Sequence, residues 1–324
     1  MRRLDCSSSQ LTWGWSIRRW HGLFLVVIML FSMIPVVWGA GIATIIELSE
    51  PQNAFEVMLG GSTKITEKLV PFVTKLQAGD TVKVIKKDCG EKPCFMTLGD
   101  NGVSKTLTFD NTRDHPYKIE DVPTTTIFGE VLKNIKDSLI FIKAKEFYVQ
   151  ALKSGPPDST TEPLTAPLLK PDVTAKLVSD GKNGLSLAWY GGKKPYTLAV
   201  YQGKTLLLEQ KNIQTEGLKL DSQAFGKKNG TYRIVLSDSS ATNSNPIESK
   251  IEWVTGEKSI LSKVLDIQLD KNLSPSAQQT LSAAWLITQD KGMWSLEAYQ
   301  HVVKEANYLP ALWIKTGLEN GIMP

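Results

Sequence analysis

The feature that most constrains the fold is a run of strand-like segments between residues 172 and 254. Apolar and polar residues alternate there in short stretches separated by turns, as in LSLAWY and YTLAVY on either side of GGKKP. This alternation is typical of strands with one buried face, and several such strands at regular turn spacing are typical of a β-sandwich. We predict seven strands, over 173–179, 184–190, 196–202, 204–210, 217–221, 230–238 and 249–254.

The aromatic residues of this region indicate both a core and a candidate edge. Trp189 shares a strand face with Leu185 and Leu187, so we expect it in the core rather than in a ligand platform. Tyr196 and Tyr201 lie five residues apart and face opposite sides of a regular strand. An exposed tyrosine there would suit a sugar- or peptide-binding edge. The early Trp, PYTLAV on the next strand and a later Gly-Thr-Tyr-Arg resemble the fibronectin type III and immunoglobulin-like group.

Residues 41–153 form a separate domain in our prediction. Strand-like bursts separated by Gly- and Asp-containing turns indicate a small antiparallel β-domain over 42–122. Apolar residues then recur at intervals of three and four up to residue 153, which predicts an amphipathic helix that packs on this domain.

The turns of this domain resemble those of the FecR-like domain of bacterial envelope proteins. The resemblance covers about fifty residues, with Leu76, Gly79 and Asp80 at the first turn and Asp100 and Gly102 at the second. It implies a periplasmic module that relays or scaffolds and performs no chemistry. A generic exported β-domain fits the same pattern.

Proline and helical spacing mark the remaining boundaries. Residues 154–171 contain five prolines and no periodicity, which predicts an extended linker. The sandwich then spans 172–255, and a helical C-terminal segment spans 256–324. Within that segment Ser274-Pro275 supplies a helix cap and a first-turn proline, and three helices follow. The overall prediction is a mainly β protein with a helical cap.

Aromatic residues are concentrated in the helical segment. The run AAWL…G…LEAYQ resembles half of a tetratricopeptide repeat, but one hairpin cannot bury a solenoid core. The segment is therefore expected either to pack on the sandwich or to bind a protein partner. The candidate interaction residues are Trp285, Trp294, Tyr299 and Trp313, which fit a protein interface and fit a small core as well.

The N-terminus resembles a targeting segment. Arginines at 2, 3, 18 and 19 precede an apolar run that ends in small residues, so residues 1–40 are predicted to be a signal peptide cut after Gly39 or Ala40. The run is about seventeen residues, close to the minimum that spans a bilayer, so an uncleaved inner-membrane anchor is the alternative. Without residues 1–40, 33 basic residues face 32 acidic ones. Such a balance gives no basic footprint for nucleic acid.

The cysteines agree with export to a periplasmic or extracellular location. Cys89 and Cys94 flank Gly-Glu-Lys-Pro between two strand-like segments, where a turn brings the thiols together, and an oxidising compartment favours a disulfide. A redox-active pair or half of a metal site are the alternatives.

Catalytic motifs are missing from the sequence. The histidines outside the first forty residues are His115, before a proline, and His301, on a helix between apolar neighbours, and surface or core roles suit both. We predict no enzyme activity and no cofactor. The favoured function is a non-enzymatic envelope protein that serves as a protein-binding scaffold or sensor component. The alternatives are a glycan-binding module and an unrecognised hydrolase.

Overall fold

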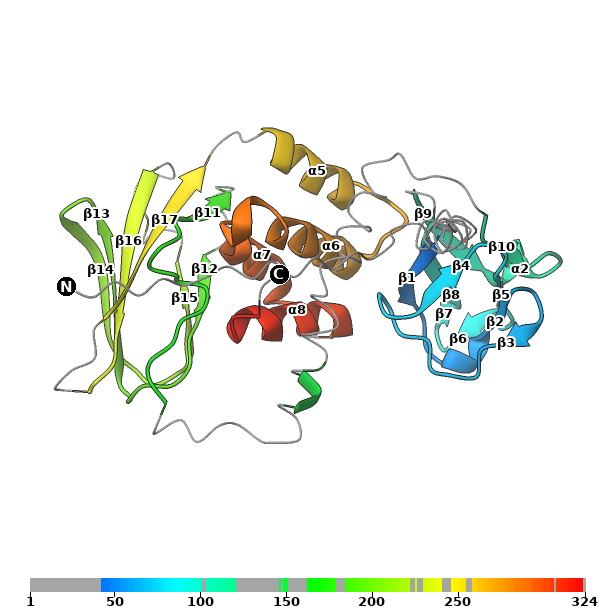
Figure 1. The fold of residues 1–324 in the computed structure, drawn as a ribbon, viewed down its shortest axis with the longest axis horizontal. Helices are drawn as coiled ribbons and strands as arrows, with labels where there is room; N and C mark the ends of the chain where they lie inside the picture. The colour runs from blue at the N-terminus through cyan, green and yellow to red at the C-terminus, as the bar shows by residue number, and fades with distance from the viewer. Residues whose placement is uncertain are drawn as a thin grey trace, which may run out of the picture. The chain divides into compact units, whose positions relative to one another are not determined.

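The computed structural model describes residues 42–100, 103–120, 146, 148–150, 162–178, 184–221, 225, 230–240, 246–254, 258–305 and 307–322. The predicted signal peptide lies outside the described residues. So does the predicted helix before residue 153, apart from four of its last residues, which are helical. The chain is mainly β, with mostly antiparallel sheets followed by helices, as the sequence predicts (Figure 1). The described residues belong to one compact unit, residues 41–324.

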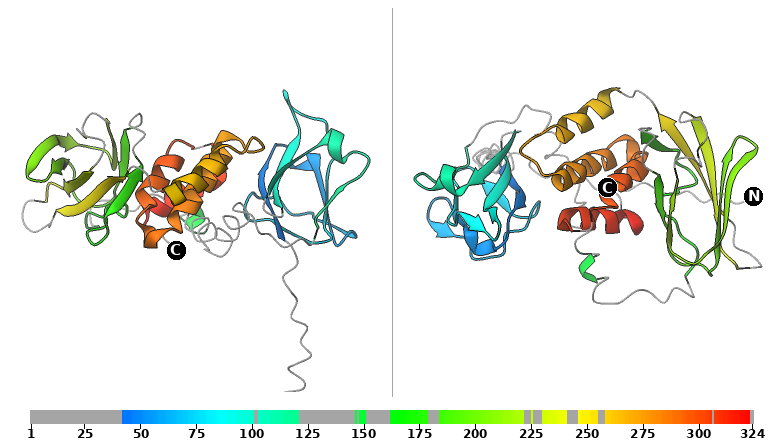
Figure 2. Two further views of the ribbon diagram at one scale, coloured as in Figure 1. Left: turned by 90° about the horizontal axis from the view of Figure 1, so that it is seen from above. Right: turned by 180° about the vertical axis from the view of Figure 1, so that it is seen from behind.

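The first part of this unit is a small β-domain. Its elements are β1 (Ile42–Leu48), η2 (Gln52–Ala54), β2 (Phe55–Leu59), β3 (Thr63–Lys64), β4 (Lys75–Gln77), β5 (Thr81–Val84), β6 (Asp88–Cys89), β7 (Lys92–Pro93), β8 (Phe95–Asp100), β9 (Val103–Thr108), α2 (Phe109–Thr112) and β10 (Tyr117–Lys118). Two antiparallel sheets, in the orders β4-β1-β8-β9 and β10-β5-β2-β3, enclose one apolar core (Figure 2).

The Gly79–Asp80 turn holds the two sheets of this domain together. Gly79 has a φ of 92°, a left-handed conformation that costs glycine little. The buried Asp80 carboxylate accepts hydrogen bonds from the backbone N–H of Gln77 at 2.7 Å and of Gly60 at 2.8 Å. Because both oxygens are bonded to backbone, Asp80 serves the fold.

A β-bulge interrupts β1 opposite β8, between Ile45 and Glu47. A bulge inserts an extra residue and re-aims the neighbouring side chains. Ile45 packs in the β-domain core, whereas the next residue, Ile46, belongs to the larger apolar cluster that contains the sandwich and the helices.

The second part of the unit is the predicted sandwich, and all seven predicted strands are present. They are β11 (Ala175–Val178), β12 (Leu185–Ala188), β13 (Tyr196–Gln202), β14 (Thr205–Ile213), β15 (Gly217–Leu220), β16 (Gly230–Ser237) and β17 (Ile247–Val254). One sheet has the order β11-β17-β16-β13-β14, and β12 pairs with β15 in the other. The neighbouring strands β17, β16 and β13 lie in the first sheet, whereas β12 and β15 form the second. In an immunoglobulin-like sandwich, strands G, F and C are divided from strands B and E in the same way.

Trp189 is a core residue of the sandwich, as predicted. Its side chain is buried, and its ring meets Tyr196 edge to face at a centroid distance of 5.7 Å. Tyr196 is buried as well and donates its hydroxyl to the carbonyl of Gly191 at 2.7 Å. The aromatic pair therefore ties the GGKKP turn to the core.

The last part of the unit is helical. It contains α5 (Lys258–Gln268), α6 (Pro275–Ile287), η4 (Asp290–Gly292), α7 (Ser295–Val302) and α8 (Leu309–Glu319). The predicted start of α6 is confirmed, because the Ser274 side chain accepts from the backbone N–H of Ala277 and Pro275 occupies the first turn.

Helix α7 packs along the unpaired edges of β11 and β12 of the sandwich (Figure 1). On β11, the backbone N–H of Val178 donates to the Glu297 carboxylate at 3.0 Å. On β12, the Gln300 side chain accepts from the N–H of Ser186 at 2.8 Å and donates to its carbonyl at 2.9 Å. Unpaired strand edges invite aggregation, and here helical side chains satisfy them.

The shared core revises two predicted boundaries. The sandwich and the helices contribute to one apolar cluster, so residue 255 separates strands from helices but does not separate two cores. The predicted linker is also too long at its C-terminal end. Ala166, Leu168 and Leu169 are buried in that cluster, and Thr165 pairs with Tyr190 of the sandwich. Apolar side chains next to the prolines explain why residues 162–171 pack as part of the fold.

Candidate functional site

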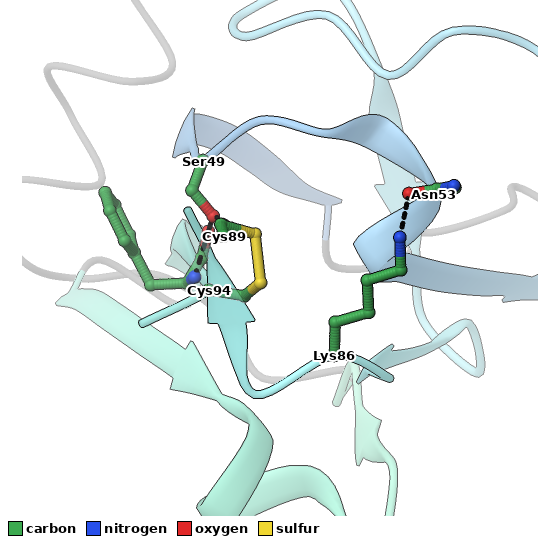
Figure 3. The surroundings of a disulfide bond; sticks show 6 residues. Ser49, Asn53, Lys86, Cys89 and Cys94 are labelled. Carbon is green, nitrogen blue, oxygen red and sulfur yellow. Dashed lines mark hydrogen bonds between the residues drawn. A yellow bond between two sulfur atoms is a disulfide. The ribbon is translucent and has the colours of Figure 1, made fainter. Parts of the chain in front are cut away.

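The predicted disulfide joins Cys89 to Cys94. Their hairpin turns at Gly90, whose φ is 74°. Figure 3 shows the bridge beside Ser49. Cys94 is buried in the β-domain core. Ser49 lies beside the bridge, where its hydroxyl accepts from the backbone N–H of Phe95 at 2.9 Å and lies 3.5 Å from the Cys89 sulfur. The disulfide thus fixes the loop that leads into β8. Disulfides are typical of proteins outside the reducing cytosol.

The two histidines considered for catalysis lie in different surroundings. His115 is exposed in the β-domain. His301 on α7 has its Nδ1 2.5 Å from Gln279 Oε1 and its Nε2 3.4 Å from Glu297 Oε1. Since Glu297 also accepts from Val178 of β11, this group of side chains connects α6, α7 and the sandwich edge.

The four predicted interaction residues lie in the core of the helical segment. Trp285, Trp294, Tyr299 and Trp313 are each at most 3% exposed and belong to the cluster shared with the sandwich. The proposed partner interface on these side chains is therefore not supported, and the small-core alternative describes their geometry. Close helix packing buries large aromatic groups wherever they lie on the inner faces.

Polar partners fix two of these aromatic side chains. Trp294 donates its indole N–H to Asp290 at 2.9 Å, and the Lys176 ammonium lies 5.4 Å from the ring centroid. Tyr299 donates its hydroxyl to Glu319 at 2.7 Å. Burial, reinforced by the negative charge of Glu319, raises the pKa of Tyr299 above its ordinary value. The hydroxyl therefore stays protonated at neutral pH and acts as a donor.

Helix α5 presents an exposed apolar pair that the sequence analysis did not single out. Val264 and Ile267 are buried against the helical core, whereas Leu265 is 52% and Leu269 66% exposed. Positions four apart lie on the same face of a helix, and Leu269 directly follows the last residue of α5. Two apolar stripes are visible in ILSKVLDIQL, and only one of them is needed for packing.

The predicted glycan-binding edge of the sandwich has less support in the structure than the surface of α5. Tyr201 is partly exposed, and the Arg233 guanidinium lies 4.3 Å from its ring centroid. Trp189 and Tyr196 are buried. The one partly exposed tyrosine of the pair is thus covered by a cation.

Two further features concern metals and membranes. Over the described ranges, no group of three or more His, Cys, Asp or Glu residues could hold a metal ion. No helix in that part of the chain is long and apolar enough to cross a membrane.

Comparison of the sequence with models of known protein families and with curated proteins finds no match. The resemblances to FecR-like, immunoglobulin-like and tetratricopeptide sequences therefore rest on the motifs that suggested them.

Proposed function

We propose that this protein is a non-enzymatic, exported protein of the cell envelope that binds another protein through α5 and acts as a scaffold or sensor component. The observation that carries this proposal is the exposure of Leu265 and Leu269 on a helix whose opposite face is fixed in the core. In helix-in-groove recognition, apolar anchors four residues apart enter an apolar groove of the partner. We infer a partner with such a groove.

The energetic contribution of this surface is moderate. Full burial of a leucine side chain contributes about 1.5–3 kcal/mol, and each of these two is already partly covered. Covering both would contribute about 2–3 kcal/mol, which is the scale of an interface hot spot. The rigid attachment of α5 lowers the entropic cost of presenting the pair.

Export is supported by two features. The predicted signal peptide at 1–40 directs the chain across the inner membrane, and the joined Cys89 and Cys94 suit an oxidising compartment. We place the protein in the periplasm or outside the cell. If the first segment is not cleaved, the inner membrane anchors the protein with the described residues facing the periplasm.

The glycan-binding alternative has less support, because the aromatic residues that would form a platform are buried or stacked against an arginine. For the hydrolase alternative, the candidate histidines of the described residues have surface or packing roles, with His115 exposed and His301 joined to Gln279 and Glu297.

Site-specific photo-crosslinking in cells tests the proposal. A photoreactive residue at position 265 should give a discrete crosslinked species, and the same residue at position 206 should not, although Leu206 on β14 is similarly exposed at 48%. Leu269→Ser should weaken the crosslink from position 265, whereas Leu206→Ser should leave it unchanged.

Two results would contradict the proposal. One is equal crosslinking from positions 265 and 206, which would indicate that α5 is not a specific surface. The other is hydrolysis of glycan or peptide by the purified protein at a rate that one carboxylate or histidine substitution abolishes.

A further inference from the structure

The outer face of the β8–β9 hairpin is polar and yet covered. In the antiparallel register Thr97 pairs with Thr106 and Gly99 with Ser104 on this face, while the inner face contributes Met96 to the β-domain core. Thr97 is fully buried and Ser104 only 8% exposed. A polar sheet face normally meets water, so something covers this one.

The covering element is the connection between α5 and α6, residues 269–274, which we call the strap. The Ser104 hydroxyl donates to the Asp270 carboxylate at 2.5 Å. The Asn272 side-chain amide donates to the Ser104 carbonyl at 3.2 Å, and the hydroxyls of Thr97 and Thr106 lie 3.4 and 3.3 Å from the Asn272 carbonyl, to which they donate. Four hydrogen bonds therefore join two strands to the strap.

The strap is itself held in one conformation. The Asp270 carboxylate accepts from the backbone N–H of Asn272 at 2.9 Å, and Gln278 of α6 donates to the Asp270 carbonyl at 2.8 Å. One carboxylate oxygen of Asp270 thus accepts a hydrogen bond from within the strap, and the other accepts one from the β-domain. This preorganisation lowers the entropy lost on docking.

A second contact lies at the bulge of β1. Tyr308 donates its hydroxyl to the Ile46 carbonyl at 2.6 Å, and the backbone N–H of Ser274 lies 3.4 Å from the Glu47 carboxylate, to which it donates. Ile46 and Phe72 are the buried β-domain side chains of the larger cluster, and Val70 and Val73 pack against it while partly exposed. Among the described residues, the apolar part of this contact is therefore limited to these four side chains, beside the hydrogen bonds described above.

We propose that the outer face of β8–β9 is a docking surface whose occupant is the chain's own strap, and that this docking is reversible. Contacts between domains that are mainly polar resemble transient protein–protein interfaces and separate more easily than apolar cores. Opening would uncover Ile46 and Phe72 together with the threonine pair. The strap continues directly from α5, but this inference does not depend on a partner there.

Single-molecule fluorescence energy transfer on the full chain tests reversible docking. Dyes are placed on Lys64→Cys and Leu206→Cys, which are exposed positions, with Cys6→Ser and the native disulfide left intact. Wild type should show one dominant distance and a minor second population. Asp270→Ala with Asn272→Ala should raise the minor population roughly tenfold or more, because a charge-assisted and a neutral hydrogen bond are removed. Lys271→Ala, an exposed strap position, is the matched control and should change nothing.

Identical distributions for wild type and the double variant would overturn the proposal. If near-ultraviolet circular dichroism shows that the double variant is not folded, Asp270→Asn replaces it and should shift the populations in the same direction. Disulfide trapping gives a second measurement. Ser104→Cys with Asp270→Cys should crosslink at least about tenfold faster than Val103→Cys with Asp270→Cys, because Val103 lies on the other face of β9. Equal rates would also overturn it.

Discussion

Replacing Gln300 by alanine measures how strongly α7 holds the sandwich. The Gln300 amide both accepts from and donates to the backbone of Ser186, at 2.8 and 2.9 Å, so it pairs with the free edge of β12 as a neighbouring strand would. Gln300→Ala removes both bonds and leaves the N–H and carbonyl of Ser186 without these partners. One hydrogen bond contributes about 1 kcal/mol net, and a buried group left unsatisfied costs about 1–3 kcal/mol.

Gln300 and Ser186 are both partly accessible, so water replaces some of what is lost. We therefore expect Gln300→Ala to lower the free energy of unfolding by about 2 kcal/mol. For a chain of this size that corresponds to a fall in Tm of about 3 °C. Urea denaturation followed by tryptophan fluorescence is the assay. Gln300→Glu is the control, since it keeps the acceptor for the Ser186 N–H and loses only the donor, so it should lower the free energy of unfolding by about 1 kcal/mol. A loss below about 0.5 kcal/mol for Gln300→Ala would refute this account of the edge.

Three further outcomes are expected. Replacing Cys89 and Cys94 together by alanine should cost about 2 kcal/mol by the chain-entropy estimate for a short loop, and thiol titration of the unreduced Cys6→Ser protein should find no free thiol. Trp189→Ala should lower the free energy of unfolding by about 3–5 kcal/mol. Trp189→Phe should cost less, because the indole N–H has no hydrogen-bond partner among the described residues. If Trp189→Ala melts like the parent, Trp189 lies outside the core. Burial raises the pKa values of Tyr299 and Tyr308 above their ordinary value, so the stability that their neutral hydroxyls provide should be full below about pH 10 and decline above it. Urea midpoints at rising pH would show this decline, and Tyr299→Phe should make it smaller.

The strands could be predicted from the sequence because their pattern is local. Alternation with a period of two and turn residues between the bursts located all seven strands of the sandwich and the main strands of the β-domain. The cap at Ser274 and the disulfide were accessible for the same reason, since each involves residues a few positions apart.

The candidate interaction surface was not accessible in this way. Trp285, Trp294, Tyr299 and Trp313 looked equally suited to an interface and to a core. Only the packing of the helices on one another, with α7 against the sandwich, placed them inside. Leu265 and Leu269 show the reverse case, in which apolar residues are exposed. Helix α5 has apolar residues on two faces, and the sequence does not say which face is covered.

The sequence by itself determined the fold class, the strand positions, the helix cap and the paired cysteines, because these depend on side-chain periodicity and short-range geometry. The tertiary structure alone decided that residues 162–171 belong to a core, that β11 pairs in parallel with β17 and that α7 replaces a strand at two open edges. It also placed the strap against β8 and β9, which lie more than 160 residues away along the chain. Such contacts form between residues far apart in sequence, and no local pattern encodes which of several apolar or polar faces will meet.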